Sequence, residues 1–348
     1  MNDNTMTIVK TVTSIMPVRN EAHYIGKCLD SIISNDYPKE NFKLLVIDGR
    51  STDRTREIVR EYTQKNPYIH LLDNPKIIQT YGSNIGLRAA KSDFIIRMDA
   101  HVLYPRDFVS KLISWIQKSG ADCVGGILIT KPGSDTVIAK VNAMVLSHPF
   151  GIGNSYFRTG LKTPKYVDTV PFGCYRKEVF EKIGFFNENL DRTDDLEFNL
   201  RLMRSGGKIF LVPEIISYYF ARPTLWTLAK QNFGNGLWVL YSLAFVKMPF
   251  SIRHIVPLFF VLSLLGTLVF AFAYQPFFYL FVLVTGLYLG VDTFVSLKLS
   301  LKKELKYFPF LLVTFPVLHL SYGVGSIWGI IKFLMYYLKS KARKLRNK

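Results

Sequence analysis

Short apolar runs alternate with amphipathic segments through the first 130 residues, and this alternation limits the folds that the chain can adopt. The predicted strands are residues 11–18, 42–49, 69–74, 93–99 and 122–129. The predicted helices lie between them, at residues 21–33, 51–65, 81–91 and 106–118, with Asp53 expected to cap the second. Repeated strand–helix units predict an α/β fold with a doubly wound, mostly parallel sheet. Its ligand is expected beyond the carboxyl ends of the strands.

Polar residues follow three of these strands. The turn "PVRNE" (17–21) follows the first strand, Asp48 lies at the end of the second, and Asp99 lies at the end of the fourth. A polar residue at a single strand end is ordinary, since strand ends are commonly solvated. Because neighbouring parallel strands end at the same edge of a sheet, we expect the three clusters to converge, and together they indicate a site.

The tripeptide Asp99-Ala100-His101 resembles a metal–diphosphate site in which histidine replaces the second carboxylate. Imidazole ligates divalent ions, and a nitrogen ligand suits Mn²⁺ better than Mg²⁺, which prefers oxygen. We therefore expect Asp99 and His101 to hold a divalent metal. The alternative is that His101 supports the site without touching the ion.

A helix is predicted near residue 200. Leu196, Leu200 and Met203 are expected to form its buried face, and the pair Gly206-Gly207 is expected to close it. Glu197 and Arg201 are spaced as a structural ion pair.

Two adjacent acids, Asp194 and Asp195, lie in the first turn of this helix. Backbone N–H groups at a helix N-terminus stabilise carboxylates, so both residues could serve as caps. One cap is enough for a helix, however, and the second acid is then available to face a cleft.

The C-terminal third is mostly apolar. Residues 255–273 and 277–297 are each long enough to cross a bilayer, which needs ~20 apolar residues. The basic stretches 297–306 and 339–348 are both expected on the cytoplasmic side. Segment 307–337 would then have to enter the membrane and return as a hairpin, and its Pro316 and glycines favour such an interruption.

Composition and charge favour a membrane-associated protein over a nucleic-acid-binding one. The chain has 348 residues, 49% of them hydrophobic, and a formal charge of +18. Such a charge suits either nucleic acid or an anionic membrane with phosphorylated substrates, and the apolar third favours the membrane. We expect no nucleic-acid partner. Cys28, Cys123 and Cys174 lack metal-binding spacing and are expected to be buried thiols in a reducing compartment.

Five motifs in this order resemble the inverting glycosyltransferases of family 2, which have the GT-A (nucleotide-diphospho-sugar transferase) fold. The motifs are "MPVRNE" (16–21), "VIDGRSTDRT" (46–55), "NIGLRAAKSDFIIRMDAH" (84–101), "PFGCYRKEVFEKIGFFNE" (171–188) and "TDDLEFNLRLMRSGGKI" (193–209). The resemblance is strongest to membrane-bound bacterial exopolysaccharide enzymes of the succinoglycan type, which are also similar in "ARPTLWTLAKQNFGNG" (221–236) and in the apolar C-terminal third.

The resemblance implies four regions and a location. They are a cytoplasmic GT-A catalytic domain (1–222), amphipathic interfacial helices (223–253), a transmembrane region (254–338) and a basic cytoplasmic tail (339–348). The expected location is the inner or plasma membrane, crossed several times. The expected partners are a nucleoside-diphosphate sugar, by default UDP-linked, a polyprenyl-linked acceptor, the membrane and other polysaccharide-assembly proteins.

The resemblance also implies residue roles. Asp195 is expected to be the general base that deprotonates the acceptor hydroxyl, supported by Asp194. A divalent ion, Mn²⁺ or Mg²⁺, on Asp99 and His101 would neutralise the departing diphosphate, and single displacement would invert the anomeric centre. The residues expected at the donor are Pro17, Arg19, Glu21, Asp48, Asn84, Arg88 and Asp99, with a structural role open for Arg88. Arg222 and Gln231 are expected on the acceptor side.

Two departures from the family pattern matter. Gly49 stands where many relatives have a second acid that contacts uracil, so the nucleobase stays open. The Gln-x-x-Arg-Trp motif of processive synthases is missing after Gln231, which favours addition of a single sugar. Two other functions remain as alternatives: transfer directly to polyprenyl phosphate, and a membrane assembly subunit that senses nucleotide sugars.

Overall fold

The computed structural model describes residues 9–247 and 251–346, and the chain forms two compact units. The first unit comprises the chain up to Ile129 together with Gly160–Tyr219, and the second comprises Thr130–Thr159 together with the chain from Phe220. The predicted boundary at residue 222 lies close to Tyr219, but segment 130–159 belongs to the second unit. Residues 248–250 of the predicted interfacial region and 347–348 of the predicted tail lie outside the described residues.

A nine-stranded sheet forms the centre of the first unit in the described part of the chain. The strand order is β3-β2-β1-β4-β8-β6-β9-β5, with β7 paired to β9. The strands are β1 Val12–Val18, β2 Phe42–Asp48, β3 Ile69–Asp73, β4 Phe94–Arg97, β5 Val102–Leu103, β6 Cys123–Pro132, β7 Lys165–Tyr166, β8 Cys174–Arg176 and β9 Ile209–Ala221.

The sheet is parallel where the predicted strands lie. β3, β2, β1 and β4 are parallel neighbours, and β1 pairs with β2 so that Val18 lies opposite Asp48. β8 is antiparallel to both β4 and β6, and therefore separates two strands that run in the same direction. The predicted α/β GT-A architecture is confirmed, and the sheet is mixed because strands from the later motifs insert into it.

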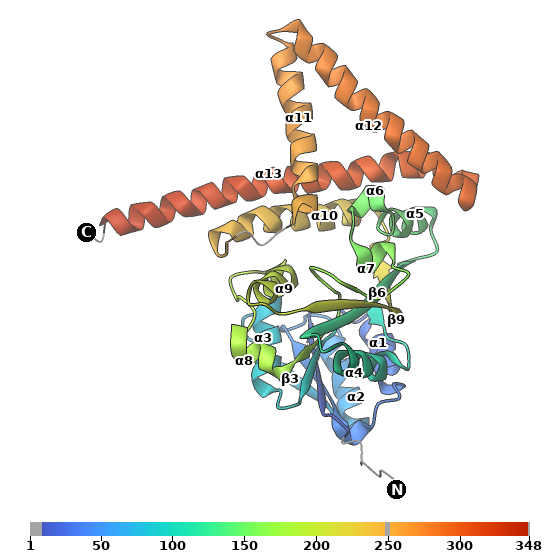
Figure 1. Ribbon diagram of the computed structural model, residues 1–348, viewed down its shortest axis with the longest axis vertical. Coiled ribbons are helices and arrows are strands. Elements are labelled where there is room, and N and C mark those ends of the chain that lie inside the picture. Colours follow the sequence, from blue (N-terminus) through green and yellow to red (C-terminus); the bar gives the residue numbers. More distant parts are fainter. Residues whose placement is uncertain (1–8, 248–250, 347–348) are drawn as a thin grey trace. The chain divides into compact units, whose positions relative to one another are not determined.

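Helices cover both faces of this sheet. The helices of the first unit are α1 Ile25–Ile33, α2 Thr55–Lys65, α3 Gln79–Ala89, α4 Phe108–Ser119, α8 Lys177–Ile183 and α9 Asp194–Arg204, with a 3-10 turn at Lys39–Asn41. α3 packs on β1 and β2, opposite α1 and α2 (Figure 1). The expected cap differs by one residue: the N-cap of α2 is Arg54, which makes no side-chain cap, and Asp53 lies one residue earlier, where its Oδ1 accepts a hydrogen bond from Thr55 N at 3.0 Å.

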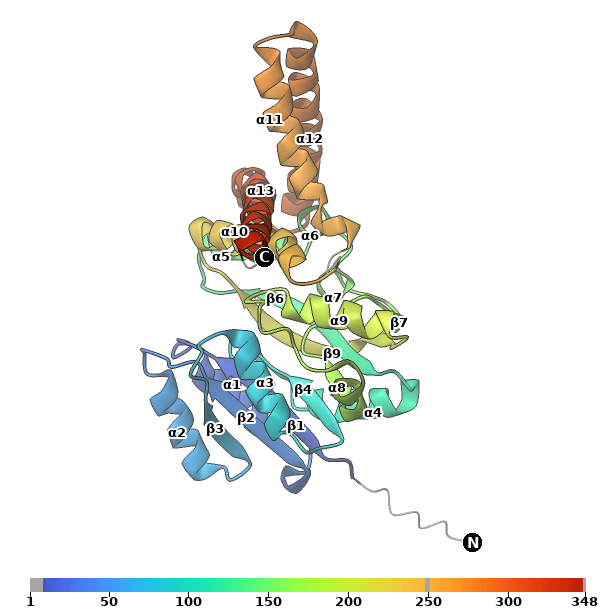
Figure 2. The same cartoon turned by 90° about the vertical axis from the view of Figure 1, so that its left-hand side faces the viewer.

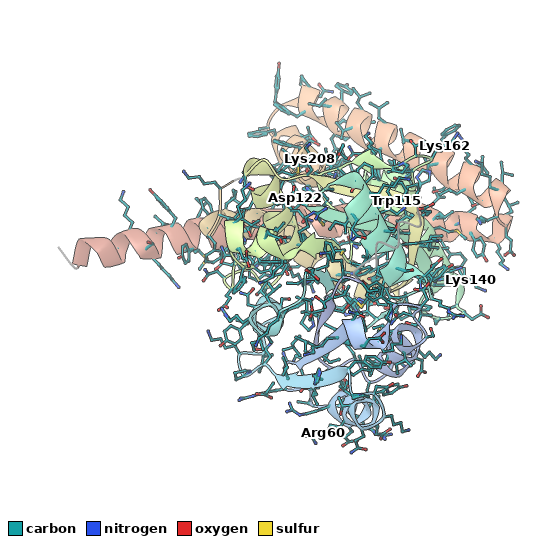
Figure 3. The ribbon with its side chains drawn as sticks, turned by 60° about the horizontal axis from the view of Figure 1, so that its bottom comes forward. Arg60, Trp115, Asp122, Lys140, Lys162 and Lys208 are labelled. Carbon is teal, nitrogen blue, oxygen red and sulfur yellow. The ribbon has the colours of Figure 1, made fainter. Side chains whose placement is uncertain are left out.

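Hydrogen bonds join the segments that precede β6 and β9. Lys208 N donates to the Asp122 carboxylate at 2.8 Å, and Asp122 N donates to the Lys208 carbonyl oxygen at 3.0 Å. Figure 3 shows both residues, which precede β9 and β6 respectively. These bonds fix where the two strands begin.

The buried face of α9 differs from the prediction. Leu196 is buried as expected, but Met203 is 41% exposed and Leu202 is buried instead. The reason is Phe198, whose ring contacts those of Phe180 and Phe186 and turns that side of the helix into the core.

The predicted pair within α9 forms and is structural. Arg201 Nε lies 2.9 Å from Glu197 Oε1, and the same guanidinium donates to the carbonyl oxygens of Ile183 and Phe185. Arg201 therefore fastens the segment after α8 to α9.

Among its described residues, the second unit consists of helices and loops apart from the ends of β6 and β9. Its helices are α5 Val137–Val145, α6 Pro149–Ile152, α7 Tyr156–Thr159, α10 Leu225–Tyr241, α11 Val256–Ala271, α12 Gln275–Lys302 and α13 Phe308–Arg346, with 3-10 turns at Ser242–Ala244, Ile252–His254 and Leu305–Tyr307. α11 and α12 form an apolar hairpin, and α10 lies along α13 (Figures 1 and 2).

The expected hairpin within 307–337 is wrong, because α13 is one continuous helix that contains Pro316. Its glycines serve packing and do not break the helix. A Cβ on Gly325 would lie 2.1 Å from the Phe233 carbonyl oxygen, and one on Gly236 would lie 2.0 Å from that of Tyr322. The missing side chains let the α10 and α13 backbones touch.

Among the described residues, two helical segments are long and apolar enough to cross a membrane. They are Gln275–Lys302 and Leu305–Ala342. The first is 11% buried over its apolar window and the second 44% buried, since α13 packs along α10. α11 is shorter, at 16 residues.

Candidate active site

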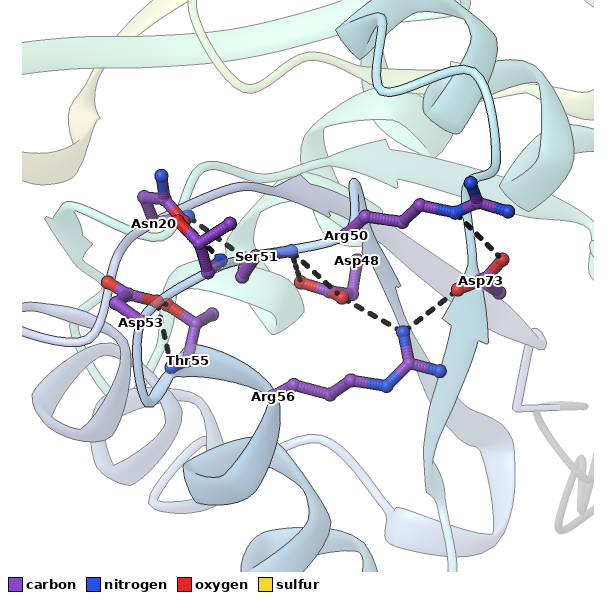
Figure 4. A network of polar contacts seen from close by, with 9 residues as sticks. Asn20, Asp48, Arg50, Ser51, Asp53, Thr55, Arg56 and Asp73 are labelled. Atoms are coloured by element: carbon purple, nitrogen blue, oxygen red, sulfur yellow. Dashed lines mark hydrogen bonds and ion pairs between the residues drawn. The ribbon is translucent and has the colours of Figure 1, made fainter.

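The turn after β1 is joined to the loop after β2 by hydrogen bonds (Figure 4). Asn20 N donates to Ser51 Oγ at 3.0 Å, and Asn20 Oδ1 accepts from Thr52 N at 2.8 Å. Glu21 N donates to Thr55 Oγ1 at 2.8 Å. The two predicted clusters therefore meet at the carboxyl ends of β1 and β2.

Asp48 is fully buried within this network (Figure 4). Arg56 lies 3.0 Å from Asp48 and 2.9 Å from Asp73, at the ends of β2 and β3, and Ser51 N donates to Asp48 at 3.3 Å. Because protein groups already contact its oxygens, Asp48 orders the loop after β2. Direct contact with a donor stays a prediction.

Of the other predicted donor residues in this turn, one lies in the protein core and two lie at the edge of the sheet. Pro17 is buried in β1 opposite Ile47, and it packs against α3 at Gly82, where an added Cβ would lie 3.3 Å from it. Arg19 is exposed just beyond the strand, and Glu21 is partly buried. Arg19 and Glu21, and not Pro17, therefore present side chains at the sheet edge.

Backbone strain gathers at the same edge. Asn20, Arg50, Phe172 and Thr193 have φ values of 55°, 53°, 48° and 62°. They follow β1 and β2 and precede β8 and α9. Left-handed backbone is uncommon outside glycine and costs of order 1–3 kcal/mol where the surroundings enforce it, typically at functional sites.

A buried cation lies at the end of β4. The Arg97 guanidinium contacts the Asp194 carboxylate at 3.2 Å, with 14% and 6% of the two side chains exposed. The same guanidinium lies over the Phe186 ring at 5.7 Å. Burial opposes the charge of Arg97, but the carboxylates of Asp194, Asp99 and Asp195 outweigh it and hold the pKa of Arg97 above its ordinary value.

Arg97 interacts with Asp99 and with the adjacent acids Asp194 and Asp195, which lie far from it in the sequence. Burial raises the pKa of Asp194 to about 6, with Arg97 opposing the shift and Asp195 adding to it. Asp195 Oδ1 accepts from Leu196 N at 2.8 Å, so this carboxylate is oriented at the N-terminus of α9. Asp194 does not cap the helix through its side chain but pairs with Arg97, which leaves the two acids with different surroundings.

His101 lies just beyond Asp99 in a closely packed setting. Its Nδ1 lies 3.3 Å from Glu21 Oε1. Its ring meets those of Tyr24 and Tyr219 edge-on, with centroid distances of 6.5 and 5.5 Å. Asp99 N donates to the hydroxyl of Tyr104 at 2.8 Å, which fixes the backbone of the tripeptide.

The donor set of this tripeptide fits a divalent ion that is bound together with phosphate. The described residues contain no group of three or more His, Cys, Asp or Glu side chains that could hold a metal by themselves. Mg²⁺-type sites in phosphate chemistry use one or two protein ligands and complete their coordination with substrate oxygens. The carboxylate of Asp99 meets that requirement, and the imidazole of His101 adds a nitrogen ligand that suits Mn²⁺ better than Mg²⁺.

Asn84 and Arg88 lie on α3 and fasten it to the segment after α8. Asn84 Nδ2 donates to the Phe186 carbonyl oxygen at 2.9 Å, and Asn84 Oδ1 accepts from Phe186 N at 3.0 Å. Arg88 contacts Glu188 at 3.2 Å, and Asn84 also donates to Glu188 at 3.0 Å. These contacts favour the structural role left open for Arg88 and extend it to Asn84.

The predicted acceptor-side residues belong to the second unit. Arg222 is exposed and its carbonyl oxygen accepts from Asn142 Nδ2 at 2.8 Å, while Gln231 is half-buried on α10. Their roles stay predictions.

Sequence reasoning missed the partners of two site residues. Arg97 is the last residue of an otherwise apolar strand. A cation at such a position indicates a buried acidic partner, but the sequence does not say that this partner is Asp194. The contact of Glu21 with His101 joins residues 80 positions apart and has no signal in a single sequence.

Comparisons with known proteins place the chain among relatives. The family model for glycosyl transferase family 2 matches residues 13–184. A Methanococcus voltae protein named dolichyl N-acetyl-α-D-glucosaminyl phosphate 3-β-D-2,3-diacetamido-2,3-dideoxy-β-D-glucuronosyltransferase is 31% identical over 92% of this chain and 97% of its own. The succinoglycan biosynthesis protein ExoA of Rhizobium meliloti (strain 1021) is 27% identical over 92% of this chain and 94% of its own.

A solved structure supports the fold. The mannosyltransferase PcManGT from Pyrobaculum calidifontis, solved with GDP-Man and Mn²⁺, superposes with a TM-score of 0.61 at 19% identity. The match covers 92% of this chain and 88% of that one. With the family match and the full-length relative, these findings identify the chain as a member of glycosyltransferase family 2 and an enzyme of that family.

Proposed function

We propose that this enzyme moves one sugar from a nucleoside-diphosphate donor to a hydroxyl of a lipid-linked saccharide, with inversion at the anomeric carbon. The observation that carries the proposal is the buried Arg97–Asp194 pair, which lies beside the oriented carboxylate of Asp195. The Methanococcus voltae relative supports the acceptor class, because its name specifies transfer to a dolichyl phosphate-linked sugar. That name also favours a lipid-linked sugar over free polyprenyl phosphate as the acceptor.

In this mechanism Asp195 accepts the proton of the acceptor hydroxyl as the oxygen attacks the anomeric carbon. Its Oδ1 is held by Leu196 N, so Oδ2 is the oxygen that takes the proton. Arg97 keeps the negative charge of the adjacent Asp194 compensated and so limits repulsion around the base. General-base catalysis of this kind contributes typically 10²–10⁴-fold to the rate.

The donor end is proposed at the carboxyl edge of β1, β2 and β4. Arg19 is exposed there to meet the diphosphate or the nucleotide, and the buried Asp48–Arg56 pair orders the loop beside it. Asp99 and His101 would hold a divalent ion, which when bound supplies positive charge for the departing diphosphate. UDP stays the default nucleotide, and GDP is the competing one because PcManGT was solved with GDP-Man.

The second unit is proposed to anchor the enzyme to the membrane. α12 is long, apolar and mostly exposed, and with α11 it forms a hairpin that could enter the bilayer and return. Both ends of that hairpin, including Lys298 and Lys302, would then lie on the cytoplasmic side. α13 need not cross, because it packs along α10, so its basic end stays on the same side as Lys302.

Transfer by the purified full-length protein tests this proposal. UDP-, GDP- and dTDP-sugars are offered with a polyprenyl-diphosphate-linked sugar or with polyprenyl phosphate as the acceptor. Asp195→Asn should lower transfer at least 100-fold and leave donor binding within about twofold. Asp191→Asn, four residues away, is the matched carboxylate-to-amide control and should transfer normally. Normal transfer by Asp195→Asn would refute the assignment of the base.

A further inference from the structure

Glu21 and His101 form a contact that has no evident role in the fold. Glu21 Oε1 lies 3.3 Å from His101 Nδ1, with 19% and 22% of the two side chains exposed. The residues come from different motifs, one in the turn between β1 and α1 and the other after β4. Neither side chain is needed to end a strand or to cap a helix.

The backbone holds Glu21 in place independently of its side chain. Glu21 N donates to Thr55 Oγ1 at 2.8 Å, and the Glu21 carbonyl oxygen accepts from Tyr24 N and Ile25 N at 2.9 Å each. Thr55 is in turn held by Asp53 at 3.0 Å. The backbone position of Glu21 is therefore set by the turn, and a change of the side chain should leave that turn intact.

The imidazole is also confined. Tyr24 and Tyr219 contact its ring edge-on, and Val102, the next residue, pairs with Tyr219 of β9. A ring enclosed by two tyrosines and a carboxylate has little rotational freedom left to lose when it binds a ligand. Such preorganisation is what a metal-ligating side chain needs.

We propose that Glu21 is a positioning residue that accepts a hydrogen bond from Nδ1–H of His101 and thereby presents Nε2 of His101 to the divalent ion. This inference rests on the proposed metal role of His101. A histidine that binds a metal usually donates its other ring N–H to a carboxylate or carbonyl, which fixes the tautomer and raises the basicity of the ligating nitrogen. The 3.3 Å separation is longer than a well-aligned hydrogen bond, and we expect it to shorten once the ion and the diphosphate are bound.

Metal binding to the full-length protein tests the inference without any measurement of transfer. Mn²⁺ affinity is measured in the presence of UDP, and of GDP, from the electron paramagnetic resonance signal of free Mn²⁺. Pulsed measurements on the bound ion report a coordinated imidazole through its ¹⁴N coupling. We expect Glu21→Gln to weaken Mn²⁺ binding roughly 10–100-fold, as for other partners of ligating histidines. Glu57→Gln, an exposed change on α2, is the matched control and should bind Mn²⁺ as the wild type does.

The double variant Glu21→Gln/His101→Ala tests whether Glu21 acts on the metal through His101 or independently of it. If Glu21 acts through His101, the losses of Glu21→Gln and His101→Ala should not add, and the double variant should resemble His101→Ala. Glu21→Asp, which keeps the charge but shortens the reach, should recover part of the affinity. Comparable thermal unfolding of all the variants shows that the fold is retained.

Three results would overturn the inference. Wild-type affinity and an unchanged ¹⁴N coupling in Glu21→Gln, with both lost in His101→Ala, would leave the metal role of His101 standing and remove that of Glu21. Additive losses in the double variant would assign Glu21 an independent role. Wild-type protein with no ¹⁴N coupling would refute His101 as a ligand, and would leave the base role of Asp195 untouched.

Discussion

Replacement of Arg97 by methionine should destabilise the first unit, in a way that depends on pH. Arg97 and Asp194 are 3.2 Å apart and almost wholly buried, so Arg97→Met leaves a buried carboxylate without its counter-charge. Removing one partner of a buried pair costs roughly 3–5 kcal/mol. For a unit of this size that corresponds to a fall in the midpoint of thermal unfolding of roughly 6–20 °C.

The sign of the pH dependence follows from Asp194. Its folded pKa, about 6, lies above its unfolded value, so protonated Asp194 favours the native state below the unfolded pKa, and that stabilisation is lost as pH rises through about 6. Without Arg97 the folded pKa rises further, and the variant loses stability over a higher pH range. Each unit of additional shift is worth about 1.4 kcal/mol. The deficit of Arg97→Met relative to wild type should therefore be larger at pH 8 than at pH 5.5.

Thermal unfolding of the full-length protein in detergent, followed by intrinsic fluorescence at both pH values, measures this deficit. Arg88→Met is the matched control, because Arg88 also lies 3.2 Å from its partner Glu188, with 51% of its side chain exposed. An exposed pair contributes about 0–1 kcal/mol, so that control should shift the midpoint little. A deficit for Arg97→Met that is no larger than the control, or equal at pH 5.5 and pH 8, would refute the reasoning.

Three further predictions concern packing and the metal. Asn84→Ala should lower the unfolding midpoint by the equivalent of about 1–3 kcal/mol, because it leaves the buried backbone groups of Phe186 unpaired. An unchanged midpoint would show that the bonds between Asn84 and Phe186 do not stabilise the fold. Gly236→Ala should destabilise the α10–α13 pair, whereas Gly286→Ala, which meets nothing within 4 Å, should not; equal effects in thermal scans would exclude close backbone packing as the cause. Chelation with EDTA should reduce transfer, and Mn²⁺ should restore it; transfer that is insensitive to EDTA would argue against a divalent ion.

The sequence predicted those parts of the fold that depend on local pattern. The runs 42–49 and 93–99 predict strands because the first is mostly apolar up to Asp48 and the second is apolar from Phe94 to Ile96. Parallel strands of that kind place their ends at one edge, so the convergence of the clusters followed from topology. The insertion of β8 between β4 and β6 did not follow, because strand order depends on which edges pair and a single sequence does not record that.

The wrong prediction of a hairpin within 307–337 has a physical cause. Glycine lowers helix propensity, so Gly323 and Gly325 predict an interruption. In the structure these glycines allow close packing, Gly323 against Val261 of α11 and Gly325 against Phe233 of α10. The lower helix propensity of glycine is a local effect that the sequence shows. The close packing between helices is a tertiary effect, and it can be seen only in the folded structure.

The pairing of Glu21 with His101 also bears on why this chain lacks the second carboxylate of the usual motif. An aspartate at position 101 has no N–H to donate, so Glu21 could no longer orient the ligating group through the contact that it makes with His101. His101→Asp should therefore bind Mn²⁺ more weakly than wild type, even though it restores the common ligand type. Adding Glu21→Gln should recover affinity, because its amide N–H can donate to the new carboxylate and orient it, the opposite of its expected effect beside His101. If His101→Asp binds Mn²⁺ as well as wild type with Glu21 unchanged, then the histidine is not matched to its neighbour, and the two positions vary independently.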